Sequence, residues 1–392
     1  MRWPFLVPGR LRANSVCAIA DVESGGVGFA IAELSHTRQE PVRILAYERA
    51  VLPHGERGAR HTASASLGLL SRVGARVLHS FAVSQAAQKH GHVASAHVIL
   101  RAPWYSSETH RNDSVYPKAQ AIRQRTITEL AEQAIRESAG SSLPFESAVL
   151  RVLLNGYPTG KPIGKSAVEL SVITLSSHSS AKMNARAHTA VSSLLPGRDV
   201  RVHSGMRASL AALHEILTRT NTFTIMIVGA DMTECIVVRK DEVSQHVRIP
   251  FGTSAVIREL SGANGLPDET EHLFKAAFID GEDSKATSAL REKLARAEIE
   301  YASRFGAALG SLAERRRLPN ECVLITHPFF APWLETFVTR IDFSPFTVTT
   351  HPFNVEVLQN AHVAHAVAWS EDTPPDVAIS LAALFVRAYV GK

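Results

Sequence analysis

The segment from Thr222 to Leu260 constrains the fold of this chain most strongly. Two apolar, β-rich runs, Phe223–Val228 and Cys235–Val238, flank a bend of small and polar residues at 229–233. A polar turn follows, then a third β-rich run at Val243–Ile249 and a Pro-Phe-Gly sequence that opens a helix. The pattern therefore predicts strand, glycine bend, strand, turn, strand and helix in that order.

A weaker copy of this pattern lies near the start of the chain. Val16–Ala20 is an apolar run, and it is followed by the bend Asp21–Gly28 and by a second apolar run at Phe29–Leu34. After a polar turn, Val42–Tyr47 is again β-rich. Two units built alike predict two related lobes whose hairpin bends face each other across a cleft.

The two bends resemble those of the bacterial actin-like group that contains FtsA, of cell division, and PilM, of type IV pilus assembly. The first bend of that group carries Asp-x-Gly-Ser/Thr, and this chain has Asp21-Val22-Glu23-Ser24. The second carries Asp-x-Gly-Gly-Gly-Thr-Thr-Asp, and this chain has the matching run Ile227–Glu234. The resemblance implies an α/β fold, the bilobed actin-like ATPase fold with two ribonuclease-H-like lobes and a small inserted α+β subdomain.

A third stretch supports the inserted subdomain. Asn155-Gly156-Tyr157 and Pro162–Ala167 resemble the turn and the approach to a strand that the group has there. The polar run 106–116 leads into a predicted amphipathic helix at 118–137. The length of 392 residues suits two domains. We predict a first lobe at 1–103 and 199–220, the insert at 104–198, a second lobe at 221–260 and 319–392, and a helical subdomain at 261–318.

In the resembling group, ATP lies between the two bends. The resemblance assigns the following residues to an ATP site of weak or lost affinity: Asp21, Ser24, Gly25, Gly26, Gly229, Asp231, Thr233, Glu271, Lys275 and Thr326. Glu271 and Lys275 match a Glu-x-x-Lys helix of the group except that their spacing is one residue longer. An exposed ion pair between positions i and i+4 is the alternative for these two residues.

Departures from the group's motifs argue against an active nucleotide site. Glu23 stands where a glycine would admit phosphate, and a carboxylate at ~4 Å with an effective dielectric near 20 repels an anion by ~4 kcal/mol. Ile227 replaces a metal-facing aspartate, and Asp231 places a further negative charge in the second bend. In the adenosine-facing turn, His327 and Pro328 replace two glycines. We therefore predict no catalytic residue and no metal site, and ATP and Mg²⁺ are at most weak ligands.

Composition narrows the function further. The chain is 45% hydrophobic and 20% charged, as is ordinary for a globular protein, with a net charge of +5. Its dense basic run, Arg315-Arg316-Arg317, has no interleaved aromatic residue, which argues against nucleic acid as a partner. Cys17, Cys235 and Cys322 each lie within an apolar run and are far apart, which predicts buried reduced thiols.

The sequence shows no transmembrane segment, because no run approaches the ~18 consecutive apolar residues that one needs. The apolar start, Met1–Arg10, contains two prolines and suits an extended contact with a membrane or partner better than a signal peptide. A final helix is predicted at Val377–Val390, and the sequence ends there without the membrane-binding tail of FtsA. This favours the pilus type over the division type.

These observations favour a non-catalytic, cytoplasmic actin-like scaffold held at the inner face of the membrane by a membrane-anchored partner. Its setting would be type IV pilus assembly (PilM-like) or cell division (FtsA-like), and self-association stays open. Two alternatives also stay open: an ATP-binding, polymerising FtsA-like protein and a sugar kinase of the same superfold. Changing Glu23 to glycine and Ile227 to aspartate is predicted to raise the affinity for nucleotide.

Overall fold

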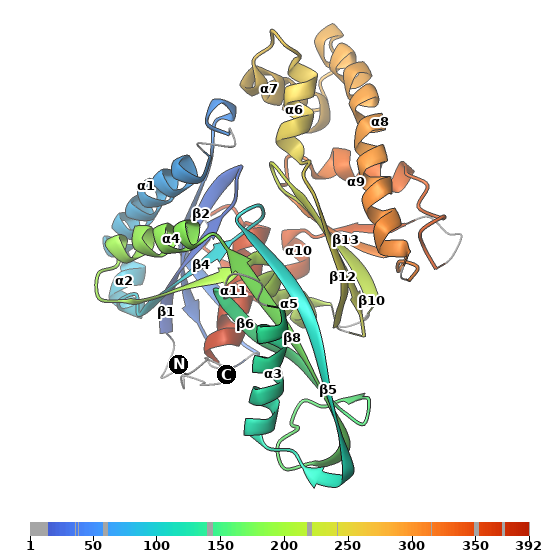
Figure 1. The fold of residues 1–392 in the computed structure, drawn as a ribbon. Helices are drawn as coiled ribbons and strands as arrows, with labels where there is room; N and C mark the ends of the chain where they lie inside the picture. Colours follow the sequence, from blue (N-terminus) through green and yellow to red (C-terminus); the bar gives the residue numbers. More distant parts are fainter. Residues whose placement is uncertain are drawn as a thin grey trace.

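The computed structural model describes residues 15–391 apart from 36, 38, 58–61, 139–143, 218–221, 241, 315, 349–352 and 371–372. Met1–Arg10 and Arg315, on which sequence predictions rest, lie outside the described residues. In the described part of the chain the strands form three sheets, with helices packed on their faces (Figure 1).

The strands of the first two sheets are β1 (Ser15–Val22), β2 (Gly26–Leu34), β3 (Val42–Val51), β4 (Ser95–Leu100), β9 (Asp199–Ser204) and β15 (Val367–Trp369), then β10 (Thr222–Val228), β11 (Thr233–Arg239), β12 (Glu242–Ile249), β13 (Glu321–Thr326) and β14 (Asn354–Val357). The third sheet has β5 (Tyr105–Ala121), β6 (Glu146–Leu154), β7 (Tyr157–Pro158) and β8 (Ser166–Ser179). The helices are α1 (Thr62–Ala82), α2 (Gln85–His90), α3 (Gln124–Ser138), α4 (Ala181–Leu194), α5 (Gly205–Ile216), α6 (Thr253–Ser261), α7 (Pro267–Phe278), α8 (Lys285–Ala313), α9 (Ala331–Arg340), α10 (Asn360–Val363) and α11 (Val377–Val390), with a short 3-10 turn at His54–Glu56.

The first two sheets repeat one topology. The first has the order β15-β3-β2-β1-β4-β9, and the second has the order β12-β11-β10-β13-β14. In each, three antiparallel strands form two successive hairpins, and the first strand of the three also pairs in parallel with a later strand. The internal repeat predicted from the two bends is therefore confirmed.

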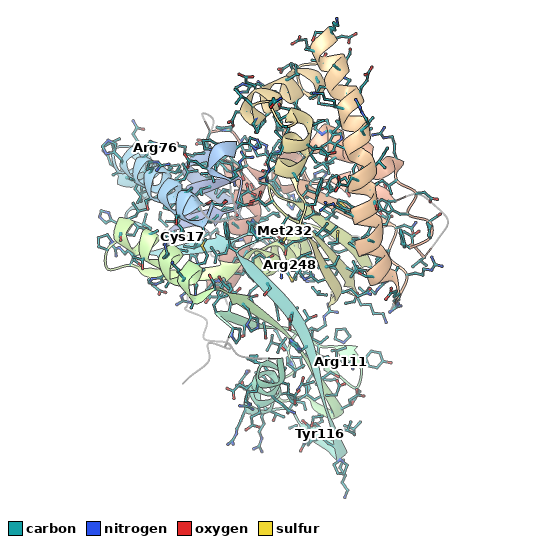
Figure 2. The ribbon with its side chains drawn as sticks, turned by 45° about the horizontal axis from the view of Figure 1, so that its top comes forward. Cys17, Arg76, Arg111, Tyr116, Met232 and Arg248 are labelled. Atoms are coloured by element: carbon teal, nitrogen blue, oxygen red, sulfur yellow. The ribbon has the colours of Figure 1, made fainter. Side chains whose placement is uncertain are left out.

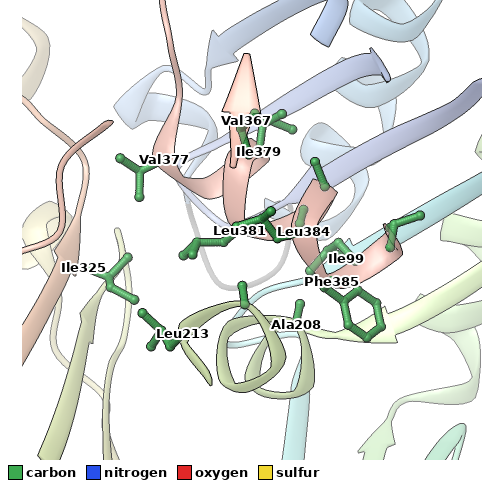
Figure 3. Close-up of a cluster of buried hydrophobic side chains, with 14 of the residues drawn as sticks. Ile99, Ala208, Leu213, Ile325, Val367, Val377, Ile379, Leu381, Leu384 and Phe385 are labelled. Carbon is green, nitrogen blue, oxygen red and sulfur yellow. The ribbon is translucent and has the colours of Figure 1, made fainter. Parts of the chain in front are cut away.

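The strands that carry the first bend are buried on both faces. All of β2 and nearly all of β1 are buried, as their almost continuous apolar sequences require. One face packs with α1 and α4, and the other packs against α5 and α11. Figure 3 shows α11 in this second core, with Leu381 and Leu384 near Leu213 of α5 and Ile325 of β13 nearby.

Two elements that the sequence grouped with the second lobe pack against the first sheet. β15 pairs in parallel with β3, from Val367 opposite Val42 to Trp369 opposite Ile44. Helix α11 contacts β1 and β2 and packs along α5. Because α11 is apolar around most of its circumference, it can be buried from every side, but its sequence does not indicate which sheet buries it.

The insert, which we define as residues 105–179, consists of the sheet β5-β8-β6-β7 and helix α3 (Figure 1). The predicted polar run 106–116 and the start of the helix at 118 are corrected here, since β5 extends through Ala121 and α3 begins at Gln124. β5 is an edge strand whose side chains are mostly exposed, so its sequence lacks the apolar alternation of a strand. The grouping of α4 with the insert is also corrected, because its buried residues join the core beneath α1.

The remaining predictions concern the second lobe, the thiols and the membrane. Helices α6, α7 and α8 pack on one another at 253–313, near the predicted helical subdomain. Cys17, Cys235 and Cys322 are buried and unpaired, and burial raises the pKa of Cys17 and Cys235 to about 12. Among the described residues, no helix combines the length and the apolar character that crossing a bilayer requires.

Candidate functional site

The two bends lie on different sheets and meet across one cleft. A Cβ atom added at Gly25 would lie 2.7 Å from the Cβ atom of Ala230, so the bends touch each other. Beside this contact lie two cavities of about 70 and 50 Å³ that share Glu23, Arg49 and Gly229 in their walls. The first cavity provides space for a small number of water molecules.

Arg49, on β3, lines both cavities. Its Nη2 donates to Asp21 Oδ2 at 2.8 Å, and its Nη1 donates to Glu23 Oε1 at 3.2 Å. Its Nε donates to Asp376 Oδ2 at 2.6 Å. One guanidinium group thus holds three carboxylates together, and only 11% of the Arg49 side chain is exposed.

Asp376 ties this cluster to the last helix. Its Oδ1 accepts from the backbone N–H of Ile379 at 2.8 Å and caps α11, while Tyr47 donates its hydroxyl to Oδ2 at 2.5 Å. Burial alone would raise the pKa of Asp376, but Arg49 and these hydrogen bonds outweigh it and lower the pKa to about 2. Burial alone would likewise lower the pKa of Arg49, but the carboxylates raise it well above its ordinary value.

A second arginine completes the coordination of Asp21. Arg101, which follows β4, donates from Nε to Asp21 Oδ1 at 2.6 Å. It also donates to Ser209 Oγ at 3.0 Å and to the carbonyl of Ala378 at 3.2 Å. Both carboxylate oxygens of Asp21 are therefore bound to guanidinium groups, and the residue is fully buried.

The second bend is held by backbone contacts and packing. The Gly229 N–H donates to the carbonyl of Met232 at 2.9 Å, and the Gly229 carbonyl accepts from Thr253 N at 3.0 Å. A Cβ atom at Gly252 would lie 2.4 Å from the Gly229 oxygen, so the start of α6 presses directly on the bend. Asp231, which lines neither cavity, accepts from Arg258 Nη2 at 3.3 Å.

The threonines assigned to the nucleotide site make contacts within the lobe. Thr233 Oγ1 donates to the carbonyl of Phe251 at 2.9 Å and contacts the hydroxyl of Tyr301 at 3.1 Å. Thr326 Oγ1 donates to the carbonyl of Val228 at 3.2 Å. Both hydroxyls therefore hold strand ends together.

Ser24 is the predicted site residue that keeps an unused polar atom. Its side chain is completely buried, and its Oγ has no hydrogen-bond partner among the residues that the structure describes. Gly26, also in the first bend, accepts from Glu23 N at 3.1 Å and pairs with Val51 of β3. A Cβ atom at Gly26 would lie 2.6 Å from the Ala50 oxygen, so this position requires glycine because of the neighbouring strand.

Glu271 lies at the upper rim of the cleft, where it bridges the lobes. Its Oε2 lies 2.6 Å from His54 Nε2, and the His54 N–H donates to Asp268 Oδ1 at 3.3 Å. Arg57 reaches from the first lobe to Ser254 Oγ at 3.1 Å. Burial raises the pKa of Glu271, but the contacts with His54 and Arg57 lower it overall.

Lys275 takes no part in this rim. It is exposed on α7, and in the described part of the chain it forms no ion pair with Glu271, which pairs with His54 instead. The alternative of an ion pair between positions 271 and 275 is therefore wrong.

The turn after β13 is occupied by aromatic side chains. Phe329 and Phe330 pack with Phe274 of α7, with ring centroids 5.6 and 5.3 Å apart respectively. Phe330 is buried and lines the second cavity together with His327. Burial and the charge of Arg49 lower the pKa of His327.

The second bend also contacts the insert. Tyr105, the first residue of β5, donates its hydroxyl to Glu234 Oε2 at 2.8 Å, and Arg248 donates to the Tyr105 carbonyl at 2.8 Å. Figure 2 labels Arg248 and Met232 in this region. Glu234 occupies the last position of the second motif, so the insert binds the motif's terminal carboxylate. Within the described ranges, no three His, Cys, Asp or Glu side chains gather as metal ligands.

The sequence analysis missed Arg49, Arg101 and Asp376, which form the ion-pair cluster in the cleft.

No family model and no curated protein sequence matches this chain. Solved structures do match it. A chain of a PilM–PilN type IV pilus biogenesis complex aligns with a TM-score of 0.57 at 13% identity, over 98% of this chain and 99% of that chain.

Two further structures cover nearly the whole chain. The ethanolamine utilization protein EutJ from Carboxydothermus hydrogenoformans aligns with a TM-score of 0.45 at 12% identity, over 97% of this chain and 92% of that chain. A Bacteroides thetaiotaomicron protein with an actin-like ATPase fold and unknown function aligns with a TM-score of 0.37 at 8% identity, over 95% of this chain and 96% of that chain. The likeness to the PilM–PilN chain, together with the repeated topology of the first two sheets, gives this chain the actin-like ATPase fold and confirms the fold predicted from the two bends.

Proposed function

We propose that this chain is a non-catalytic actin-like scaffold of the PilM type, whose nucleotide cleft is filled by its own side chains. The observation that carries the proposal is the position of Arg49, which holds Asp21, Glu23 and Asp376 in the cleft. A fold that ordinarily closes on a ligand is here held closed by internal ion pairs.

The residues present do not fit a magnesium nucleotide. Mg²⁺ is bound through carboxylates and water, but both oxygens of Asp21 are bound to arginines. A phosphate needs open backbone N–H groups between the bends, and there Gly25 lies against Ala230. The free hydroxyl of Ser24 can be satisfied by a water molecule.

The rim contacts support the same conclusion. His54 and Arg57 of the first lobe bind Glu271 and Ser254 of the second. Glu271 is the residue that the sequence resemblance assigned to adenosine, and its carboxylate is already committed to the lobe contact. The closed arrangement is therefore complete within this chain.

The likeness to a chain of a PilM–PilN complex supports the pilus setting. By this proposal, the chain is cytoplasmic, lies at the inner face of the membrane and recruits a membrane-anchored partner of the PilN kind. The same likeness covers the insert, so the insert and the lobe surfaces are the docking faces available to the partner. Cell division is the alternative setting.

Turnover and polymerisation assays test the non-catalytic part. With Mg-ATP, the purified chain is expected to release no phosphate above a buffer control and to give no nucleotide-dependent pellet. Steady hydrolysis or ATP-dependent filaments would instead support the FtsA-like alternative. The double variant Glu23→Gly, Ile227→Asp serves as the comparison, because it restores the motif residues that this chain lacks.

Crosslinking in membranes tests the partner. A full-length tagged chain, crosslinked in cells of its source and identified by mass spectrometry, is expected to capture a protein with one predicted membrane span. Capture only of soluble proteins or of further copies of this chain would contradict the recruitment role. Capture of division proteins would move the scaffold to the other setting.

A further inference from the structure

The insert ends in a surface far from the cleft, which we call the distal cap and define as residues 115–123 and 155–169. β5 and β8 pair here, with Val115 opposite Glu169 and Gln120 opposite Ala167. Tyr116 marks this end in Figure 2, where the insert projects away from both lobes. The cap is therefore a protruding surface at the extremity of the molecule.

Hydrogen bonds from a side chain and from the backbone hold the cap segments together. The side-chain oxygen of Asn155 accepts from the N–H groups of Val168 and Glu169, each at 3.0 Å. The Ile122 N–H donates to the Lys165 carbonyl at 2.8 Å, and the N–H of residue 164 donates to the Ile122 carbonyl at 2.9 Å. These segments consequently form one structural unit at the end of the insert, with β5 and β7 at the two edges of its sheet.

Large apolar side chains stand exposed on this surface. Val115 is 77% exposed, Tyr157 76%, Ile163 60% and Val168 45%. Single exposed apolar residues are ordinary, but several within one small protruding unit indicate an interaction surface. Nothing in the fold of the described residues covers them.

The segments of the cap that carry these apolar side chains also carry basic residues. Lys118, Arg123, Lys161 and Lys165 are exposed, and within the described residues none of them forms an ion pair. The acidic residue of the cap, Glu169, lies 3.9 Å from Arg111, just outside it. The cap therefore presents uncompensated positive charge beside apolar groups.

We propose that the distal cap docks directly on an anionic phospholipid surface. Lysines favour this occupant over a protein, because lysine is depleted at protein interfaces whereas basic residues beside apolar groups bind acidic headgroups. Valine, isoleucine and tyrosine side chains can enter the headgroup boundary while the lysine amines stay at the phosphates. The inference deepens the proposed scaffold function by giving the chain a membrane contact of its own.

Vesicle sedimentation with the full chain tests this contact. Wild type is expected to pellet with vesicles of phosphatidylcholine and phosphatidylglycerol and to stay in the supernatant with phosphatidylcholine alone. Each lysine near an anionic surface raises the partition coefficient onto the vesicle roughly five-fold. The triple variant K118Q/K161Q/K165Q should therefore lower that coefficient by about 100-fold. Added salt should weaken wild-type binding by screening the same charges.

A matched variant separates the cap from the net charge. K89Q/K182Q/K285Q removes three exposed lysines outside the cap and should bind nearly as wild type does. The variant Y157S/I163S keeps the charge and should lose several-fold of the binding, because it removes the apolar contact.

Three outcomes would overturn the proposal. They are no binding of wild type to the anionic vesicles, equal losses in the two lysine variants, or unchanged vesicle binding in a cap variant that loses its crosslinked protein partner. The last outcome would assign the cap to a protein. None of these results depends on nucleotide, so failure here is distinguishable from failure of the filled-cleft proposal.

Discussion

The two hairpin bends of this chain share one backbone plan but are closed by different kinds of contact. The first bend is closed by charge, with Arg49 and Arg101 bound to Asp21 and with Arg49 also bound to Glu23. The second is closed by packing, where Ala230 meets Gly25 and Gly252 presses on Gly229. Under our proposal the cleft is closed from each side by a different kind of contact, so no single substitution should reopen it.

The largest effect is expected from removing the charge that closes the first bend. Arg49→Ala leaves Asp21 with one partner and Asp376 without its guanidinium, both in buried positions. Breaking a buried ion pair by deleting one partner costs about 3–5 kcal/mol, so the free energy of unfolding should fall by that amount. Urea denaturation followed by circular dichroism measures it.

Arg76→Ala is the matched control for this experiment. Arg76 pairs with Glu48 at the surface, and 53% of its side chain is exposed, so the loss should stay below about 1 kcal/mol. Equal losses in the two variants would mean that the Arg49 cluster contributes no more than a surface pair. The difference between the bends would then need another explanation.

Overpacking tests the contact that closes the second bend. Gly25→Ala would place a Cβ atom 2.7 Å from Ala230, which should destabilise the fold by about 1–3 kcal/mol. The double variant Gly25→Ala, Ala230→Gly removes the opposing Cβ and should recover most of that loss. Gly160→Ala, whose Cβ would meet nothing within 4 Å, should have little effect. Thermal unfolding compares them, and a lack of rescue would place the strain elsewhere.

Acid should weaken the first bend, which is closed by ion pairs, more than the second bend, which is closed by packing. The pKa of Asp376 falls from 3.8 to about 2 in the folded state. The contribution of Asp376 to the free energy of unfolding is about 2 kcal/mol. It is fully present above about pH 4 and is lost as the pH falls through 2. Arg49→Ala should remove this part of the acid sensitivity. The part due to Glu146, whose pKa is also lowered to about 2, should remain.

Unfolding free energies at about pH 5 and about pH 2 measure this difference. If wild type and Arg49→Ala lose equal stability between the two values, Asp376 does not owe its acidity to Arg49. Such a result would contradict the ionic closure of the first bend.

The smallest effect is expected at Asp231. The sequence places this carboxylate in the second bend as a further negative charge, but its side chain is 26% exposed and pairs with Arg258, whose side chain is 47% exposed. Asp231→Ala should therefore change the unfolding free energy by no more than about 0.5 kcal/mol. A loss of several kcal/mol in chemical denaturation would show that charge closes both bends.

Much of the framework could be predicted from the sequence. The apolar runs around 16–34 and 223–249 and their glycine bends predict the two hairpins, and the structure confirms the repeated sheets. The position of Glu23 in the cleft followed from the motif alone. These features are local, because a strand and a turn leave a signal within a few residues.

The ion-pair cluster could not be predicted in the same way. Arg49 and Asp376 are separated by 327 residues, and no motif or spacing connects them. Asp376 did carry a local signal as the residue before a helix, but its second role is visible only after folding. Edge strand β5 was missed for a related reason, since its hydrogen bonds to β8 and not an apolar pattern hold it extended.

Direct titration of Mg-ATP into the wild-type chain tests the central claim most directly. Isothermal titration calorimetry is expected to show no binding heat up to millimolar nucleotide, because arginine side chains and the touching bends already occupy the cleft. Stoichiometric binding with a micromolar dissociation constant would contradict the account.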